Sequence, residues 1–179
     1  MGPVSEDGSE EVWLRSVVCD TGPILHLSEA NALHLLEPAG RIVVPPAVHE
    51  ELAGWMPSWP ERKPDWLRLH DLNPQAATES RGLWEAGILD RGEADALALA
   101  RQLHADWFLT DDAAARLLAE QLGLEAHGSL GVVLWAAATG RLDRHQADQS
   151  LKALFGSSLW VSSRVKQEAL SSLGELFKS

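Results

Sequence analysis

Short apolar runs alternate with longer segments of helical pattern along most of this chain, and this alternation constrains the fold more than any other feature. The runs with the length and composition of β-strands are residues 17–20, 41–44, 66–72, 106–109 and 124–127. The segments between them mostly carry apolar residues at helical spacing, and Pro or Gly marks many of their ends. Strands that alternate with helices form a parallel sheet with helices on both faces. We therefore predict an α/β fold, a three-layer α/β/α sandwich with a central parallel sheet.

The helical segments are predicted from their apolar spacing and their end signals. One helix is expected from Ile24 to Leu36, with Gly40 as its stop, and a second is expected from Pro46 to about Gly54, because Pro is tolerated at a first helical position. Residues 54–64, rich in Pro and Trp, are predicted to form a loop. Further helices are expected over 76–89, from Asp90 through the ALALARQL run, from Asp112 to Gly123, from Ser129 as N-cap to Gly140, and over most of the last 40 residues, with a break at 156–158.

The length of 179 residues favours one domain with its own core. Residues 1–14, rich in Glu, Ser and Gly, are predicted to be a flexible segment. We expect the main domain to span residues 15–145 and a helical extension, residues 146–179, to pack on that domain.

The chain is acidic, with a formal net charge of -11 from 15 basic and 26 acidic residues. This balance argues against strong nonspecific binding to DNA, which needs a basic face. It leaves room for a nucleic-acid enzyme, because carboxylates that bind divalent cations are neutralised in use. The single cysteine, Cys19, lies in an apolar run and is predicted to be a small buried side chain. One cysteine, no hydrophobic leader and no long apolar run predict a protein of the cytoplasm.

Acidic residues follow two of the predicted strands. Asp20 ends the first strand, and Asp111 and Asp112 follow the fourth. In parallel α/β sheets, binding sites form at the carboxyl ends of the strands. Asp is also a good N-cap, so Asp20 and one of the later pair have a structural alternative as helix caps.

Helix geometry separates two further acids from their neighbours. Each helical residue advances about 100° around the axis, so Glu51 lies near the buried stripe of its helix while Glu50 lies nearly opposite it. By the same measure Glu93 is closer to the apolar stripe of the next acidic helix than Asp95 is. Glu93 also has a structural alternative, because Asp90-x-x-Glu93 has the spacing of a capping box.

Asp20, Glu51, Glu93 and Asp112 together predict a cluster of oxygen ligands at one sheet edge. Hard cations such as Mg²⁺ and Mn²⁺ prefer such ligands. The seven histidines show no zinc-binding spacing, and a lone histidine such as His26 is predicted to be structural. No Gly-rich phosphate loop is present.

The motifs VVCDTGPILHL, IVVPPAVHEEL, LDRGEADALALARQLHADWFLTDD and GSLGVVLWAAATGRL, in this order over residues 16–142, resemble those of PIN-domain nucleases. The resemblance is closest to an uncharacterised prokaryotic branch related to VapC-type toxins, and it extends to the tail at 150–176. It implies an acidic pocket that binds Mg²⁺ or Mn²⁺ and hydrolyses phosphodiester bonds, with RNA as the substrate.

The resemblance assigns the four family acids to Asp20, Glu51, Glu93 and Asp112. Metal ligation falls on Asp20, Glu93 and Asp112. Supporting roles fall on Thr21, beside the first acid, and on Asp95 and Asp111. Assignment of the third and fourth acids stays open by one or two residues.

Substrate binding has to come from residues other than acids. Basic side chains interleaved with aromatics suit single-stranded nucleic acid, and the chain offers Arg62, Lys63 and Arg68 among Trp55, Trp59 and Trp66. The alternative is a loop folded over its own tryptophans. Arg91 and Arg116 adjoin the acids in sequence and are phosphate-contact candidates or surface charges.

Two alternatives to a nuclease stay open. A PIN-like fold can lack catalysis and act as a nucleic-acid or protein binding module. A receiver or phosphatase domain also places acids at strand ends, but its DxDx[TV] start is absent, because Asp20 is followed by Thr-Gly-Pro. The resemblance further implies a small antitoxin protein that inserts a side chain into the acidic pocket, and a homodimer. The apolar C-terminal residues Leu151, Leu154, Phe155, Leu159 and Trp160 could form a dimer surface or belong to the core.

Overall fold

The computed structural model describes residues 14–178. The segment predicted to be flexible, residues 1–14, therefore lies outside the described residues apart from Leu14. In chain order the elements are β1 (Ser16–Cys19), α1 (Thr21–Glu29), η1 (a 3₁₀ helix, Leu33–Ala39), β2 (Arg41–Val44), α2 (Pro46–Trp55), α3 (Trp59–Arg62), β3 (Arg68–Leu69), α4 (Pro74–Glu85), α5 (Arg91–Gln102), β4 (Trp107–Leu109), α6 (Ala113–Gln121), β5 (Ala126–His127), α7 (Ser129–Ala138), α8 (Arg144–Phe155) and α9 (Ser163–Leu176).

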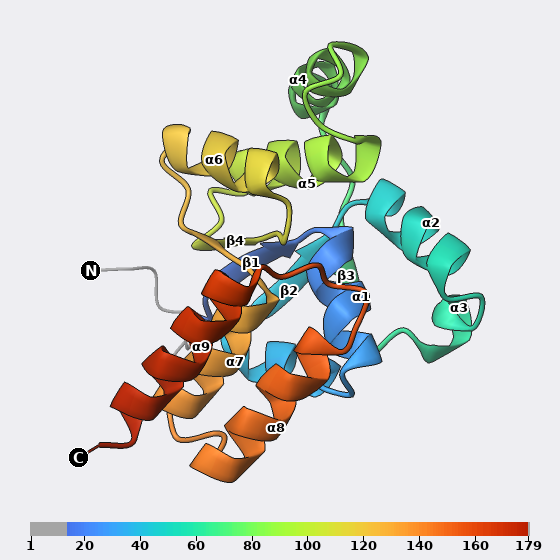
Figure 1. Ribbon diagram of the computed structural model, residues 1–179. Coiled ribbons are helices and arrows are strands. Elements are labelled where there is room, and N and C mark those ends of the chain that lie inside the picture. The colour runs from blue at the N-terminus through green and yellow to red at the C-terminus, as the bar shows by residue number, and fades with distance from the viewer. Residues whose placement is uncertain (1–13, 179) are drawn as a thin grey trace, which may run out of the picture.

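Within these residues the strands form one parallel five-stranded sheet in the order β3-β2-β1-β4-β5. Val17 of the central strand β1 is in register with Ile42 of β2 and with Trp107 of β4. Helices α5 and α6 cover one face of the sheet, and α1 and α7 cover the other, with α8 and α9 outside them (Figure 1). The predicted α/β/α sandwich with a central parallel sheet is confirmed.

The apolar composition of β1 follows from its position in the middle of the sheet. Val17, Val18 and Cys19 are fully buried, because helices cover both faces of the sheet and no side of the strand meets water. The prediction of a small buried cysteine is confirmed. Helix α4 packs on the outside of α5, and α2 contacts both α1 and α5 at the edge of the layers (Figure 1).

Three local predictions are wrong. The helix expected from Ile24 to Leu36 is divided, because Asn31 adopts a left-handed conformation (φ 54°) between α1 and η1, and Asn tolerates that region better than most residues. The loop expected at 54–64 contains α3, whose Trp59 is only 4% exposed. Ser129 is the first helical residue of α7 and Gly128 is its N-cap, since the serine side chain bonds to Asp111 instead.

The C-terminal helices share the core of the sheet layers. Leu151 and Leu154 of α8 are fully buried, and α8 and α9 contact α7 and each other. Trp160, between the two helices, is 85% exposed. Of the apolar residues considered for a dimer surface, Leu151 and Leu154 are therefore core residues, and Trp160 is on the surface. Across residues 14–178, no helix combines the length and the apolar character that a membrane crossing needs.

Candidate active site

Asp20 lies where β1 ends, next to the end of β4, at the point where the strand order reverses direction. Its backbone N–H donates to the Leu109 carbonyl (2.9 Å). One carboxylate oxygen accepts from the Thr21 N–H (2.7 Å) and the other accepts from the Thr110 hydroxyl (3.0 Å). Asp20 therefore caps α1, as its structural alternative predicted, and it is also a buried carboxyl group, only 3% exposed.

Burial raises the pKa of Asp20 to about 7, since an ionised carboxylate is poorly solvated there. The hydrogen bonds from Thr21 and Thr110 oppose this rise in pKa, and the negative charges of Glu93 and Glu51 add to it. The charges of Glu93 and Glu51 therefore act on the carboxyl group of Asp20.

Glu93 connects the fourth acid to this group. Burial raises its pKa, the Asp90 N–H that donates to its carboxylate lowers it, and the charges of Asp112, Asp90 and Glu51 raise it further. The bond from the Asp90 N–H, at 2.9 Å, belongs to the predicted capping box of α5. Glu93 thus forms the capping box of α5 and is also affected by the charges of Asp112 and Glu51.

Glu51 reaches inward from α2, as helix phase predicts. Its carboxylate accepts from the Thr21 hydroxyl (2.5 Å) and from the Gly92 N–H (2.9 Å). Glu50 is exposed, with Arg91 at 3.9 Å, and both side chains are largely solvated. Arg91 is therefore a surface charge beside the site.

The paired acids after β4 have different surroundings. Asp111 Oδ1 accepts from the Ser129 N–H (2.7 Å), and Asp111 Oδ2 accepts from the Ser129 hydroxyl (2.6 Å) and lies 2.7 Å from His26 Nδ1. This side chain therefore connects α1, the end of β4 and α7. Asp112 accepts from the Ala115 N–H (2.8 Å) as the N-cap of α6, and its charge acts on Glu93. Of the pair, Asp112 is the one whose charge raises the pKa of Glu93.

Asp95 is not brought to this group. Its carboxylate accepts a hydrogen bond from Ser80 of α4, on the far side of α5 from the sheet. Arg116 donates to the Thr110 carbonyl (3.2 Å) and so lies beside the carboxyl end of β4.

The predicted nucleic-acid residues divide into core and surface. Trp59 donates to His49 Nδ1 (3.0 Å), and Lys63 Nζ donates to the Leu67 carbonyl (2.9 Å), so both stabilise the fold. Arg62 and Arg68 are exposed. Trp55 is 71% exposed and follows Glu51 by four residues on α2, which puts both on one helix face about 6 Å apart along the axis.

The four carboxylates have the chemistry of a hard-cation site. All their donor atoms are oxygens, one of the acids is buried, and among the described residues no Lys, Arg or His forms an ion pair with any of them. In residues 14–178 no group of three or more His, Cys, Asp or Glu side chains is arranged to hold a metal ion as it stands. Each of the four carboxylates instead accepts at least one hydrogen bond from an N–H or O–H group of the protein. Their oxygen atoms are of the kind that a hard divalent cation prefers.

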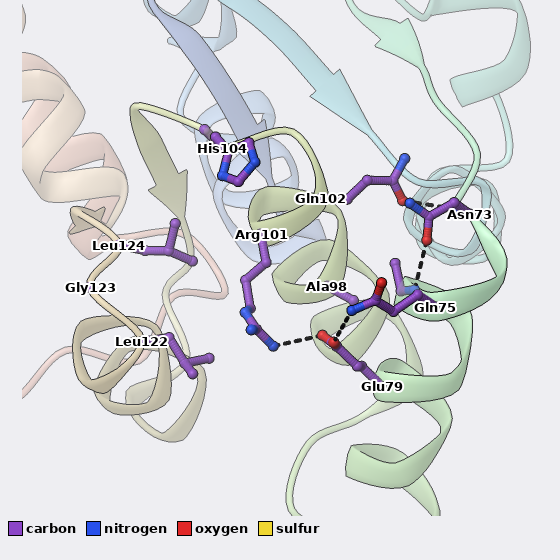
Figure 2. A pocket seen from close by; sticks show the side chains of 12 residues that line it. Asn73, Gln75, Glu79, Ala98, Arg101, Gln102, His104, Leu122, Gly123 and Leu124 are labelled. Atoms are coloured by element: carbon purple, nitrogen blue, oxygen red, sulfur yellow. Dashed lines mark hydrogen bonds and ion pairs between the residues drawn. The ribbon is translucent and has the colours of Figure 1, made fainter.

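A separate polar pocket of about 580 Å³ lies among α4, the C-terminal end of α5 and the α6–β5 connection (Figure 2). Its Arg101 pairs with Glu79 (2.6 Å), and the two side chains point toward each other across the pocket. Arg101 is about 12 Å from Glu93 along the axis of α5. None of the four clustered carboxylates lines this pocket, so it is distinct from the candidate active site.

Three residues of the site were missed by the sequence reasoning. Thr110 and Ser129 supply hydroxyls to Asp20 and Asp111, and Gly92 supplies the N–H that binds Glu51. The only signal for Thr110 was its position as a polar residue at the end of an apolar strand.

Comparison with known proteins assigns the chain to a family. The family model DUF3368, described as a PIN domain, matches residues 16–175. A search of curated proteins found no match. Since the match covers residues 16–175 of the 179, the chain belongs to this family of PIN domains, whose fold is of the nuclease type.

Proposed function

We propose that this protein is a metal-dependent endoribonuclease that hydrolyses phosphodiester bonds in RNA. The observation that carries the proposal is the cluster of Asp20, Glu51, Glu93 and Asp112, in which Asp20 is buried and no basic side chain of the described residues neutralises the group. A buried carboxylate without a counter-charge is unfavourable. A bound divalent cation removes that penalty.

Asp20, Glu93 and Asp112 are the proposed ligands of Mg²⁺ or Mn²⁺. These three carboxylates would hold the cation, which would supply charge that lowers the pKa of the attacking water and offsets the negative charge of the scissile phosphate. In the reaction, water adds to phosphorus and the bond to one ribose oxygen breaks. That oxygen takes up a proton, so the products are a phosphate monoester and a hydroxyl.

Glu51 and Thr21 have a different part in this proposal. Both carboxylate oxygens of Glu51 accept hydrogen bonds from the protein, one of them from the Thr21 hydroxyl. Glu51 therefore orients Thr21 and the edge of the site, and its charge keeps the cluster attractive to a cation. Asp111 supports Asp112 by fixing the backbone after β4 to α1 and α7.

Trp55 is the proposed contact for the RNA. It is exposed one helical turn from Glu51, and a base stacked on an exposed indole contributes about 1–3 kcal/mol without regard to sequence. Arg62 and Arg68 are exposed and are offered as further phosphate contacts. Lys63 is the weakest candidate of the three, because its ammonium group already donates to the carbonyls of Pro64 and Leu67.

The alternative is a PIN fold that binds nucleic acid or protein without cleaving RNA. The observation in its favour is that each of the four carboxylates accepts a hydrogen bond from another group of the protein. Titrating Mn²⁺ by calorimetry while assaying cleavage of single-stranded RNA separates the two functions. Saturable Mn²⁺ binding with cleavage supports the enzyme, and RNA binding without Mn²⁺ binding or cleavage supports the binding module.

We extend the proposal to the physiological setting, a cytoplasmic toxin of the VapC type held by a small antitoxin. An apolar groove of about 600 Å³ among α6, α7 and α9 begins beside Asp111 and Arg116, and Trp160 lines it. It would accommodate an apolar segment of the antitoxin, and a basic side chain of that segment would reach the acids.

Two experiments test these assemblies. Co-purification with the product of the adjacent gene tests the antitoxin partner. Sedimentation of the purified chain tests the proposed homodimer.

A further inference from the structure

The Glu51 carboxylate joins three helices that are distant in the sequence. Glu51 lies on α2, accepts from the hydroxyl of Thr21 at the start of α1, and accepts from the N–H of Gly92 in the first turn of α5. Helix α2 packs beside both α1 and α5 (Figure 1). This carboxylate therefore fixes the edge where the three helices meet.

Position 92 has no room for a side chain beside this carboxylate. A Cβ built on Gly92 would lie 2.3 Å from one Glu51 carboxylate oxygen, 2.5 Å from the other and 2.6 Å from the carboxyl carbon. These separations are far below van der Waals contact, and the three nearest atoms all belong to Glu51. A side chain at position 92 and the present position of the Glu51 carboxylate therefore exclude each other.

The backbone itself does not require glycine at position 92. Gly92 lies within α5 and is not among the residues with positive φ, so an L-residue fits its conformation. Gly92 is the second residue of α5, and glycine loses more backbone entropy than alanine when it is ordered in a helix. The steric reason for glycine that the structure shows is the contact with Glu51.

We propose that Gly92 is a positioning residue, whose bare Cα and N–H seat the Glu51 carboxylate at the edge of the acid cluster. The next residue in the chain is Glu93, so one turn of α5 places two of the four acids. The catalytic meaning of this seat rests on the proposed nuclease function, whereas the seat itself does not. A methyl group at position 92 displaces the flexible end of Glu51 and removes both of its hydrogen bonds, while the helix remains intact.

The seat is tested by urea unfolding in EDTA, with Gly92→Ala in two backgrounds, wild type and Glu51→Ala. The matched control is Gly82→Ala within α4, where an added Cβ meets nothing within 4 Å. We expect Gly82→Ala to raise the unfolding midpoint in both backgrounds. Gly92→Ala should raise it only in the Glu51→Ala background. An equal rise from Gly92→Ala in both backgrounds overturns the seat. If Glu51→Ala does not fold, the shorter Glu51→Asp takes its place.

The positioning role is tested by Mn²⁺ affinity and by Mn²⁺-dependent cleavage of RNA. Residues that orient a metal site typically change affinity or activity 10–100-fold when altered, so we expect about a 10-fold loss for Gly92→Ala. No further loss should follow when Gly92→Ala is added to the Glu51 variant. Unchanged affinity and cleavage in Gly92→Ala, or the same loss in both backgrounds, refutes the role. If the wild type itself binds no Mn²⁺ and cleaves no RNA, the proposed function fails, and the urea experiment still decides the seat.

Discussion

Replacing Asp20 by asparagine should stabilise the metal-free protein while abolishing its activity. A pKa raised from 3.8 to about 7 means that the folded protein holds the ionised form unfavourably. Each pKa unit corresponds to about 1.4 kcal/mol, so ionising Asp20 costs the fold about 4 kcal/mol at pH 8. The amide keeps both hydrogen bonds, since its oxygen can accept from the Thr21 N–H and its NH₂ group can donate to the Thr110 hydroxyl. A buried amide also loses solvation, so we expect a net gain of about 2 kcal/mol for Asp20→Asn.

Urea unfolding at pH 8, followed by tryptophan fluorescence, measures this gain. The experiment is run in EDTA and again with Mn²⁺, which should stabilise the wild type but not the variant. The matched control is Asp106→Asn, because Asp106 also accepts a backbone N–H (2.6 Å) but is exposed, and this change should give no gain. Lower stability of Asp20→Asn than of wild type in EDTA would refute the reasoning, because it would show that the ionised carboxylate is held favourably.

Three further predictions follow from the site. Between pH 7 and pH 4 the contribution of Asp20 to the free energy of unfolding should rise as the pH falls, because folded Asp20 takes up a proton that the unfolded chain binds only near pH 4; the stability difference between wild type and Asp20→Asn, measured by urea unfolding across that range, should therefore shift in favour of the wild type. Trp55→Ala should raise the KM for single-stranded RNA about 10-fold with little change in kcat, whereas Trp84→Ala, a partly exposed tryptophan on α4, should leave both constants unchanged in the same steady-state assay. Asp111→Ala should destabilise the fold by about 2 kcal/mol, because it leaves the buried N–H of Ser129 without its partner. Asp112→Ala should cost about 1 kcal/mol, because it removes the N-cap of α6, and it should abolish cleavage. If urea unfolding shows a larger destabilisation for Asp112→Ala than for Asp111→Ala, the two roles are reversed.

The sheet could be predicted because its strands carry their own signal. Runs such as Val17–Cys19 are apolar without alternation, as strands buried on both faces must be, and each is separated from the next by a helical pattern. The break at Asn31 could not be predicted, since leucines at helical spacing continue across it. It is fixed by one residue in the left-handed conformation.

The site residues that lie on helices could be predicted from helix phase, and those that follow a strand could not. Phase distinguishes Glu51 from Glu50 because one turn of a single helix decides which acid points inward. It does not distinguish Asp111 from Asp112, which leave a strand end in irregular backbone and differ only through partners on other elements. Gly92 was not predictable for the same reason, because its importance comes from a side chain 41 residues away.

The most direct test of the central claim is cleavage of a labelled single-stranded RNA by the purified chain across a titration of Mn²⁺. The account predicts saturable, Mn²⁺-dependent cleavage that EDTA abolishes and that Asp20→Asn lacks at every Mn²⁺ concentration, although the variant is folded. Equal cleavage in EDTA, or cleavage by Asp20→Asn at the wild-type rate, would contradict the claim that the four carboxylates form a metal-dependent active site.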